Sequence, residues 1–432
     1  MPNFQGMGHS AHPVSGNLCY LCFPDCCLEP CNRSLGPLGQ VHYTSHNRHL
    51  TLDIEEGQPS MLMPAGSCPL SICYHSQRNR IMRTLVLLLA LSQSLQAQPS
   101  TRNAVERALP LLQRSAAEFV SKRSCFSCHH NALPILVLHT ARDRGFTIDP
   151  VALSAVEDKT FNDLRASNAL DQAIQVSTLS DPTPNDSLLL MAAAAAGIER
   201  NLTMAVRAQQ ILGWQQDGHW FTSDFRPPHS SSLFTATATA VRAIDLYAPA
   251  ELHTQKERAM DAARKWLRKT SPASTEDAAF RLMGLVWAGC SPNDLASAKS
   301  DLLALQNQDG GWSQLRGYES DAYSTGESLF ALREAGMAAG DTDWQRGMTF
   351  LVSTQSADGT WHVRTRMVSP ATVSPPYFAT GFPYGKDEFL SYAGTSWAVM
   401  ALLRSLPEPP PAPLRDVQDA EPWIRTALFG NV

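Results

Sequence analysis

Charge is scarce in this 432-residue chain: only 17% of its residues are Asp, Glu, Lys or Arg, and the net charge at pH 7 is −5. Binding to nucleic acid needs a basic field, so this balance excludes a general nucleic-acid-binding protein. Long apolar runs are also rare, and the one at Leu85–Leu91 is too short to cross a membrane, which excludes a polytopic membrane protein. No useful stretch alternates between apolar and polar residues as strands do. With 44% hydrophobic residues the chain can still bury a sizeable core.

Lysine is absent before Lys122, and residues 1–81 hold only four Arg and five Asp or Glu. The same segment holds seven of the ten cysteines, but their cluster at 19–31 lacks the two spaced pairs of a structural zinc site. No hydrophobic period persists through it. We therefore interpret residues 1–81 as an extension outside the fold, either disordered or read from a wrongly assigned upstream start.

The next segment has the anatomy of a secretory signal peptide. Met82 and Arg83 supply a positive start, Leu85–Leu91 an apolar run, and Ala97 a small residue for cleavage. Residues 82–97 are thus predicted to be a signal peptide, and the mature protein is expected to begin at Gln98 and to be secreted or periplasmic. An ordinary apolar helix at 84–95 within a true extension is the alternative.

A Cys-x-x-Cys-His motif follows, formed by Cys125, Cys128 and His129. This is the attachment sequence of c-type haem: two thiols bond the two vinyl groups, and the next histidine ligates the iron. Export agrees with that reading. The sequence therefore predicts covalent haem c within a helical segment at 98–145, with His129 as the proximal ligand of the haem iron.

Two other readings of the motif stay open. Cys125 and Cys128 could form a plain disulfide or a dithiol pair, or could hold zinc together with His129 or His130. His130 is also a candidate second haem ligand, although the sequence leaves the sixth position of the iron unassigned.

Beyond residue 100 apolar residues recur at helical spacing almost throughout, which predicts an all-α protein and, within it, a helix at 149–179. Three turns share an Asp-Gly-x-Trp sequence, with their aspartates 92 and 49 residues apart, so a helical hairpin of roughly 40–50 residues repeats. The aspartate is expected to accept hydrogen bonds from free backbone N–H groups, and the tryptophan to pack on the preceding helix end. The residues assigned to these turns are Asp217, Trp220, Gln306, Asp309, Gly310, Trp312, Gln355, Asp358, Gly359 and Trp361.

These turns resemble the QW repeats of the squalene/oxidosqualene cyclase and protein prenyltransferase superfamily, over roughly residues 183–406. The resemblance implies an α/α toroid at 146–406, built of about five to six helical hairpins around a central cavity. Its inner helices are expected near 184–197, 232–247, 276–288, 322–335 and 390–406. A generic helical solenoid explains the Asp-Gly-x-Trp turns less well. Residues 407–432 read as a proline-rich linker and a C-terminal tail.

No catalytic set of that superfamily transfers to this chain. The Asp-x-Asp-Asp acid motif of the cyclases is absent, and no cysteine stands at the comparable 321–327 stretch, where prenyltransferases place a zinc ligand. Whether the protein is an enzyme is therefore left open. The weak candidates for a catalytic acid on inner helices are Asp186, Glu276, Asp277, Asp321 and Glu327; helix capping is the simpler role for each.

Two functions follow from the sequence. In the first, an exported protein bearing haem c uses the toroid to bind an apolar, isoprenoid-like molecule, for electron transfer to a redox partner or redox chemistry on that ligand. In the second, the toroid is a cyclase-like or prenyltransferase-like enzyme, or a lipid binder, without haem. No nucleic-acid partner and no transmembrane span in the mature chain are expected.

Overall fold

The computed structural model describes residues 101–123, 130–175, 181–223, 226–229, 231–366, 379–407, 409–410 and 422–430. The predicted extension at 1–81, the predicted signal peptide at 82–97 and the residues Cys125, Cys128 and His129 lie outside these ranges. Within them the predicted all-α class is confirmed: the described residues contain helices and two isolated β-bridges but no strand.

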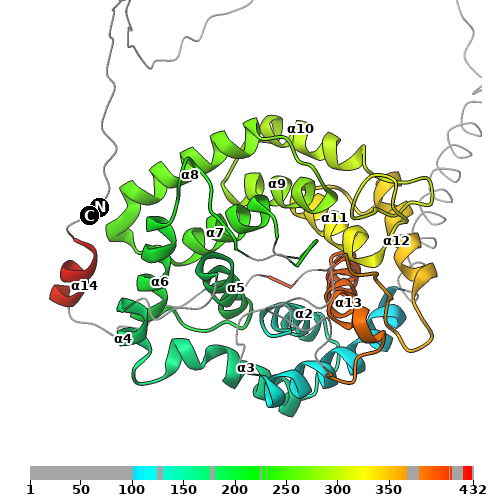
Figure 1. Cartoon of the computed structure of the whole chain (residues 1–432), viewed down its shortest axis with the longest axis horizontal. Coiled ribbons are helices and arrows are strands. Elements are labelled where there is room, and N and C mark those ends of the chain that lie inside the picture. The colour runs from blue at the N-terminus through cyan, green and yellow to red at the C-terminus, as the bar shows by residue number, and fades with distance from the viewer. Residues whose placement is uncertain are drawn as a thin grey trace, which may run out of the picture. The chain divides into compact units, whose positions relative to one another are not determined.

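The helices alternate along the chain between an inner and an outer layer (Figure 1). The inner helices are α2 (Ala132–Asp143), α5 (Pro182–Ala195), α7 (Leu233–Tyr247), α9 (Thr275–Trp287), α11 (Ala322–Glu334) and α13 (Glu388–Leu403). The outer helices are the one at 101–122, α3 (Pro150–Arg165), α4 (Ala169–Ile174), α6 (Leu202–Gly213), α8 (His253–Lys269), α10 (Pro292–Leu303) and α12 (Thr342–Thr354).

The inner helices contact one another in chain order, and the last of them, α13, packs against the first, α2, as well as against α11. The outer helices lie against them from outside. This position explains the composition of each layer. Every residue of α13 is buried, whereas α8 buries only four of its seventeen residues and carries its charges on the free face.

Two details differ from the sequence-based expectation. A sixth inner helix, α2, follows directly after the Cys-x-x-Cys-His motif. The helix expected at 149–179 breaks into α3 and α4, because Ala166 adopts an extended conformation and the side chain of Asn201 caps the freed Leu164 carbonyl at 3.0 Å.

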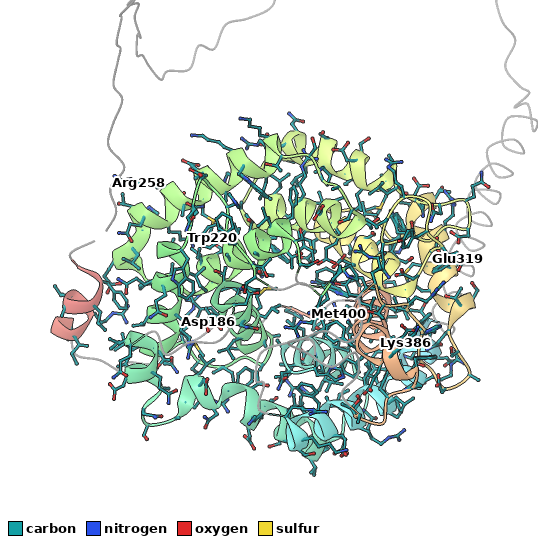
Figure 2. The ribbon with its side chains drawn as sticks, viewed as in Figure 1. Asp186, Trp220, Arg258, Glu319, Lys386 and Met400 are labelled. Atoms are coloured by element: carbon teal, nitrogen blue, oxygen red, sulfur yellow. The ribbon has the colours of Figure 1, made fainter. Side chains whose placement is uncertain are left out.

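The three Asp-Gly-x-Trp turns join the two layers by one repeated set of bonds. In each turn the indole Nε1 donates to a carbonyl of the preceding outer helix, and the tryptophan backbone N–H donates to a threonine hydroxyl of the following inner helix. The sets are Trp220 with Ile211 and Thr237, Trp312 with Leu302 and Thr325, and Trp361 with Leu351 and Thr395, at N···O distances between 2.6 and 3.2 Å. Figure 2 marks Trp220 between α6 and α7.

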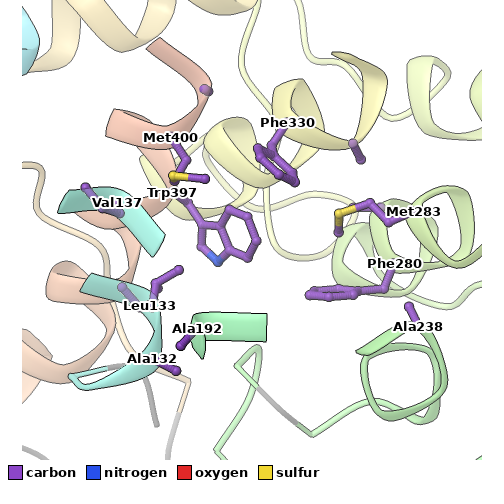
Figure 3. Close-up of a cluster of buried hydrophobic side chains, with 14 of the residues drawn as sticks. Ala132, Leu133, Val137, Ala192, Ala238, Phe280, Met283, Phe330, Trp397 and Met400 are labelled. Carbon is purple, nitrogen blue, oxygen red and sulfur yellow. The ribbon is translucent and has the colours of Figure 1, made fainter. Parts of the chain in front are cut away.

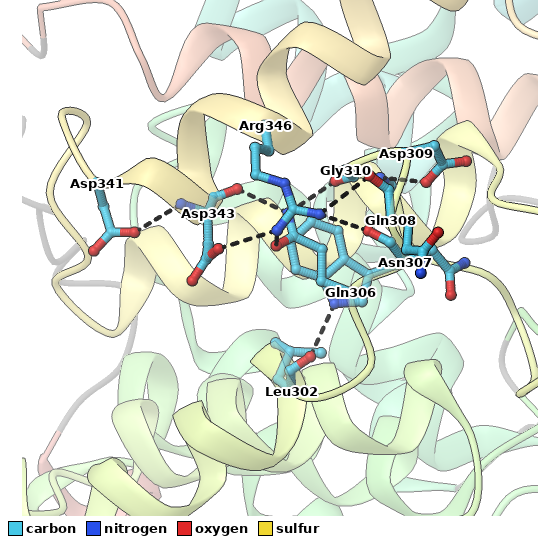
Figure 4. A network of polar contacts seen from close by, with 11 residues as sticks. Leu302, Gln306, Asn307, Gln308, Asp309, Gly310, Asp341, Asp343 and Arg346 are labelled. Carbon is cyan, nitrogen blue, oxygen red and sulfur yellow. Dashed lines mark hydrogen bonds and ion pairs between the residues drawn. The ribbon is translucent and has the colours of Figure 1, made fainter.

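The same turns also fasten neighbouring outer helices. Gln306 donates to the Asp343 carbonyl at the start of α12 (Figure 4), and Gln355 donates to the Ala104 carbonyl of the helix at 101–122. The expected aspartate bonds are present in two copies, where Asp309 accepts from the backbone of Gly311 and Asp358 from that of Thr360. The outer layer is thus linked across the point where the helix at 101–122 meets α12.

The C-terminal helix α14 (Pro422–Phe429) packs against the short 3₁₀ helix η1 (Ala250–Leu252). Arg425 pairs with Glu251 at 2.9 Å, and Gln209 of α6 donates to the Leu428 carbonyl at 3.0 Å. The tail therefore lies on the outer layer.

Candidate active site

The first turns of three inner helices meet around one buried carboxylate. Glu276, the second residue of α9, is 3% exposed. Its Oε1 accepts a hydrogen bond from the Thr235 hydroxyl of α7 at 2.7 Å, and its Oε2 accepts one from the Tyr323 hydroxyl of α11 at 2.8 Å. Burial raises the pKa of Glu276 to about 7 against these two bonds, which favour the charged form.

Glu327 is the second member of the site, one turn beyond Tyr323 on α11. It is fully buried, and no hydroxyl, amide or cationic group of the described residues donates to either of its oxygens. Burial and the neighbouring charge of Glu276 raise the pKa of Glu327 well above its usual value. The two carboxyl groups lie close enough for each to shift the pKa of the other, so their protonation is linked.

We refer to Glu276, Glu327, Tyr323 and Thr235 as the carboxyl pair site. A glycine beside it lets two inner helices approach closely. A Cβ on Gly326 would lie 2.5 Å from the backbone of Trp397 and Ala398, so only glycine at this position lets α13 lie this close to Glu327.

An aromatic cluster continues from the site along the same helices (Figure 3). Phe280 stands one turn after Glu276 on α9, and Phe330 one turn after Glu327 on α11, so each shares a helix face with its carboxyl group. Both pack against Trp397 of α13, with ring centroids at 6.3 and 5.5 Å. The thioethers of Met283 and Met400 extend this apolar surface.

Two of the remaining acid candidates are helix caps. Asp321 caps α11 by accepting from the Ser324 backbone at 2.8 Å, and burial raises its pKa to about 6. Asp277 completes the capping box of α9 with Ser274. Both are close enough to Glu327 for their charges to raise its pKa further.

Asp186 serves a different purpose. It pairs with Arg207 at 2.6 Å, with both side chains buried, and so ties α5 to α6. Burial raises the pKa of Asp186, while the Arg207 charge opposes that shift. Of the five candidates that sequence analysis named, the structure brings Glu276 and Glu327 together as a pair, whereas Asp186 is committed to its arginine.

The surroundings of the Cys-x-x-Cys-His motif are described from residue 130 onward. His130 is fully buried, with its ring stacked between Phe119 at 4.7 Å and Tyr392 at 3.8 Å. His139 on α2 lies 2.6 Å from Glu157 and 2.9 Å from Arg142. Both histidines are therefore engaged in packing or hydrogen bonding within the protein.

Sequence analysis missed the partners that define the site. Tyr323, Thr235 and Trp397 belong to no motif that marks an acid, and each stands on a different inner helix. One signal was present: Glu276 and Tyr323 occupy the same position, the second residue, of two successive inner helices. Because each repeat packs against the next, equivalent positions of neighbouring repeats come close together.

Comparisons with known proteins add little. Searches against protein families and against curated proteins found no match. Among solved structures, a glycosidase in complex with glucose is 14% identical, with 70% of this chain and 98% of that chain covered and a TM-score of 0.43. Such a slight likeness carries no argument about function.

The described part of the chain was also searched for metal-binding groups and for membrane-spanning helices. Within those residues no group of three or more His, Cys, Asp or Glu side chains is placed to hold a metal ion. None of the helices in the same ranges has the length and apolar character needed to span a membrane.

Proposed function

We propose that the carboxyl pair site is the reactive centre of an acid–base enzyme. The observation that carries the proposal is the buried pair itself: Glu276 and Glu327 lie against each other with raised pKa values, and no hydroxyl, amide or cationic group of the described residues donates to Glu327. Burying such a group costs free energy that a purely structural role does not return. Perturbed carboxyl groups in one place are typical of active sites.

The surroundings give each carboxyl group a role. Glu276 accepts two hydrogen bonds, from Thr235 and Tyr323, which stabilise its charged form and make it the base. Among the described residues Glu327 has no such donor, so it is the neutral member and gives up a proton as a general acid.

The aromatic cluster indicates the class of ligand. Phe280, Phe330 and Trp397 place apolar rings next to the acid, which suits an uncharged, largely apolar molecule. Arg404, whose guanidinium lies 5.0 Å from the centre of the Phe330 ring, is paired with Glu334. The closed order of inner-helix contacts and the three QW-type turns support placing the chain among the cyclase-like and prenyltransferase-like toroids. An isoprenoid-like ligand is what that resemblance implies.

Proton delivery to an alkene can be measured without knowing the product. The full chain is incubated with squalene in D₂O, and the extracted hydrocarbon is analysed by mass spectrometry. Acid catalysis adds deuterium to the hydrocarbon skeleton, and Glu327→Gln should abolish the incorporation. Glu334→Gln is the matched control, because Glu334 lies on the same helix but binds Trp287 and Arg404 instead. Equal incorporation by Glu327→Gln and the unchanged chain would refute the assignment.

We also propose that the chain is exported and carries haem c. The support is the motif of Cys125, Cys128 and His129 together with the signal-peptide pattern at 82–97. These residues lie outside the described ranges, so fit is judged from the donor chemistry, which suits haem. Two thiols and an imidazole would hold it, and a bound haem would supply one-electron chemistry for a redox partner or for the ligand.

Haem attachment is tested in a host that has a c-type maturation system. The purified chain should show a Soret band and a haem-sized mass increase, and His129→Ala should change the spectrum while the mass increase stays. A chain without either signal would reject the haem and leave the dithiol or zinc reading.

A further inference from the structure

The hydroxyl group of Tyr323 connects the buried pair to a half-buried histidine. It donates to Glu276 Oε2 at 2.8 Å, and the Nδ1 atom of His229 lies 3.4 Å from its oxygen. His229 is in the segment before α7, where it packs edge-on against Phe389 at 5.8 Å and is partly exposed. Tyr323 itself is 1% exposed. Two contacts, His229 with Tyr323 and Tyr323 with Glu276, thus connect a partly exposed imidazole to a buried carboxyl group.

We infer that His229, Tyr323 and Glu276 form a proton path that reloads Glu327 after it has given up its proton. The inference rests on the proposed function of the carboxyl pair site and adds residues that act before the next turnover. Neither His229 nor Tyr323 has a role in delivering the proton to the ligand itself.

Each step transfers only protons, and no group is oxidised or reduced. The Nδ1 proton of a charged His229 passes to the Tyr323 oxygen while the Tyr323 proton passes to Oε2 of Glu276. Glu276 is then neutral and hands a proton to the Glu327 carboxylate, which restores the starting pair. His229 takes up a new proton from water.

The charges around the path are consistent with this order. Glu276 from α9 and Glu327 from α11 face Tyr323, and together with burial they raise the pKa of its hydroxyl well above 10. Tyr323 therefore stays protonated, because its hydroxyl accepts one proton as it gives up another, and no tyrosinate accumulates. His130 is a titratable neighbour of His229. The charges of Asp277 and Asp321 act on Glu327.

Exchange of the carboxyl proton for deuterium measures the path directly and needs no substrate. Infrared spectra of the full chain in H₂O should contain the C=O band of a protonated, buried carboxyl group, and Glu327→Gln should remove part of it. That part is then followed in time after rapid dilution into D₂O. In the unchanged chain its deuterium shift should be complete within the mixing time.

Tyr323→Phe keeps the ring but removes the hydroxyl, and His229→Phe keeps a ring against Phe389 but removes both nitrogens. In either variant exchange should require local opening, and an opening free energy of only about 1.4 kcal/mol slows it about tenfold. Tyr392→Phe is the matched control, because Tyr392 is equally buried but donates to the Leu112 carbonyl outside the path. Its exchange should equal that of the unchanged chain.

The outcomes separate the two claims. If Tyr323→Phe and His229→Phe both exchange as fast as the unchanged chain, the path is overturned while a protonated Glu327 stands. If Glu327→Gln removes no part of the C=O band, the proposed acid itself is overturned, and the path with it.

Discussion

Replacing Gly310 with alanine should destabilise the protein because that turn has no room for a side chain. Gly310 adopts a φ of +89°, and a Cβ there would lie 2.7 Å from the Arg346 carbonyl oxygen and 2.9 Å from its carbon. Arg346 belongs to α12, whose backbone would have to move away. Its side chain binds Gln306, Asn307 and Asp343 around the same turn (Figure 4), so that movement would also strain these bonds.

Two terms set the size of the loss. A non-glycine residue in the left-handed region costs about 1–2 kcal/mol, and forcing an extra carbon into a packed interface costs about 1–3 kcal/mol. Gly310→Ala should therefore lower the free energy of unfolding by about 2–5 kcal/mol. Gly336→Ala isolates the first term, because Gly336 has a φ of +78° and no atom of the described residues lies within 4 Å of the position that its Cβ would occupy.

Urea unfolding followed by tryptophan fluorescence measures both variants, provided that the slope of the free energy against denaturant is unchanged. The difference between Gly310→Ala and Gly336→Ala should be about 1–3 kcal/mol, since the gain from a stiffer unfolded chain is common to both and cancels. Equal losses would show that the turn does not press against α12 and would refute the reasoning.

Three further predictions concern the turn, the carboxyl pair and the mature terminus. Asp309→Ala loses the bonds from Gly311 N–H and the Ser320 hydroxyl, both at 2.9 Å, and should cost about 1–2 kcal/mol of unfolding free energy in the same assay. Glu276 binds its proton more tightly when folded, with a pKa of about 7 against 4.5. Between pH 4.5 and about 7 the folded state therefore binds more protons than the unfolded state, and the free energy of unfolding should fall as the pH rises through this range. Measured against pH, that free energy should fall less steeply in Glu276→Gln than in the unchanged chain. Identical slopes would contradict the raised pKa of Glu276. Mass spectrometry of the exported natural protein should find its first residue near Gln98, and peptides from 1–80 would contradict the predicted signal peptide.

Local sequence determined most of the helix pattern. Helix starts are marked by capping residues, such as Ser274 and Ser291, whose capping boxes the structure contains. The Asp-Gly-x-Trp turns are equally local, because glycine is needed for a positive φ and tryptophan reaches back only about ten residues to its carbonyl. Such features depend on neighbours in the chain, so the chain alone reveals them.

The threonines that receive the tryptophan N–H bonds were not predicted. Thr237, Thr325 and Thr395 follow their tryptophans by 17, 13 and 34 residues, respectively. The loop between turn and inner helix differs in length in each repeat, so the sequence spacing hides a contact that is constant in space.

Tertiary structure alone decided which acid candidates form a site. Asp186, Glu276 and Glu327 all lie near the beginning of an inner helix, and by sequence they are equivalent. Packing gave Asp186 an arginine from the neighbouring outer helix and left Glu327 facing Glu276, 51 residues away in the chain. The pKa of a carboxyl group depends on burial and on charges a few ångströms away, and the repeat brings those charges from other helices. The sequence thus determined the helices and their turns, whereas only the packing of α9 against α7 and α11 brought the buried carboxyl pair together.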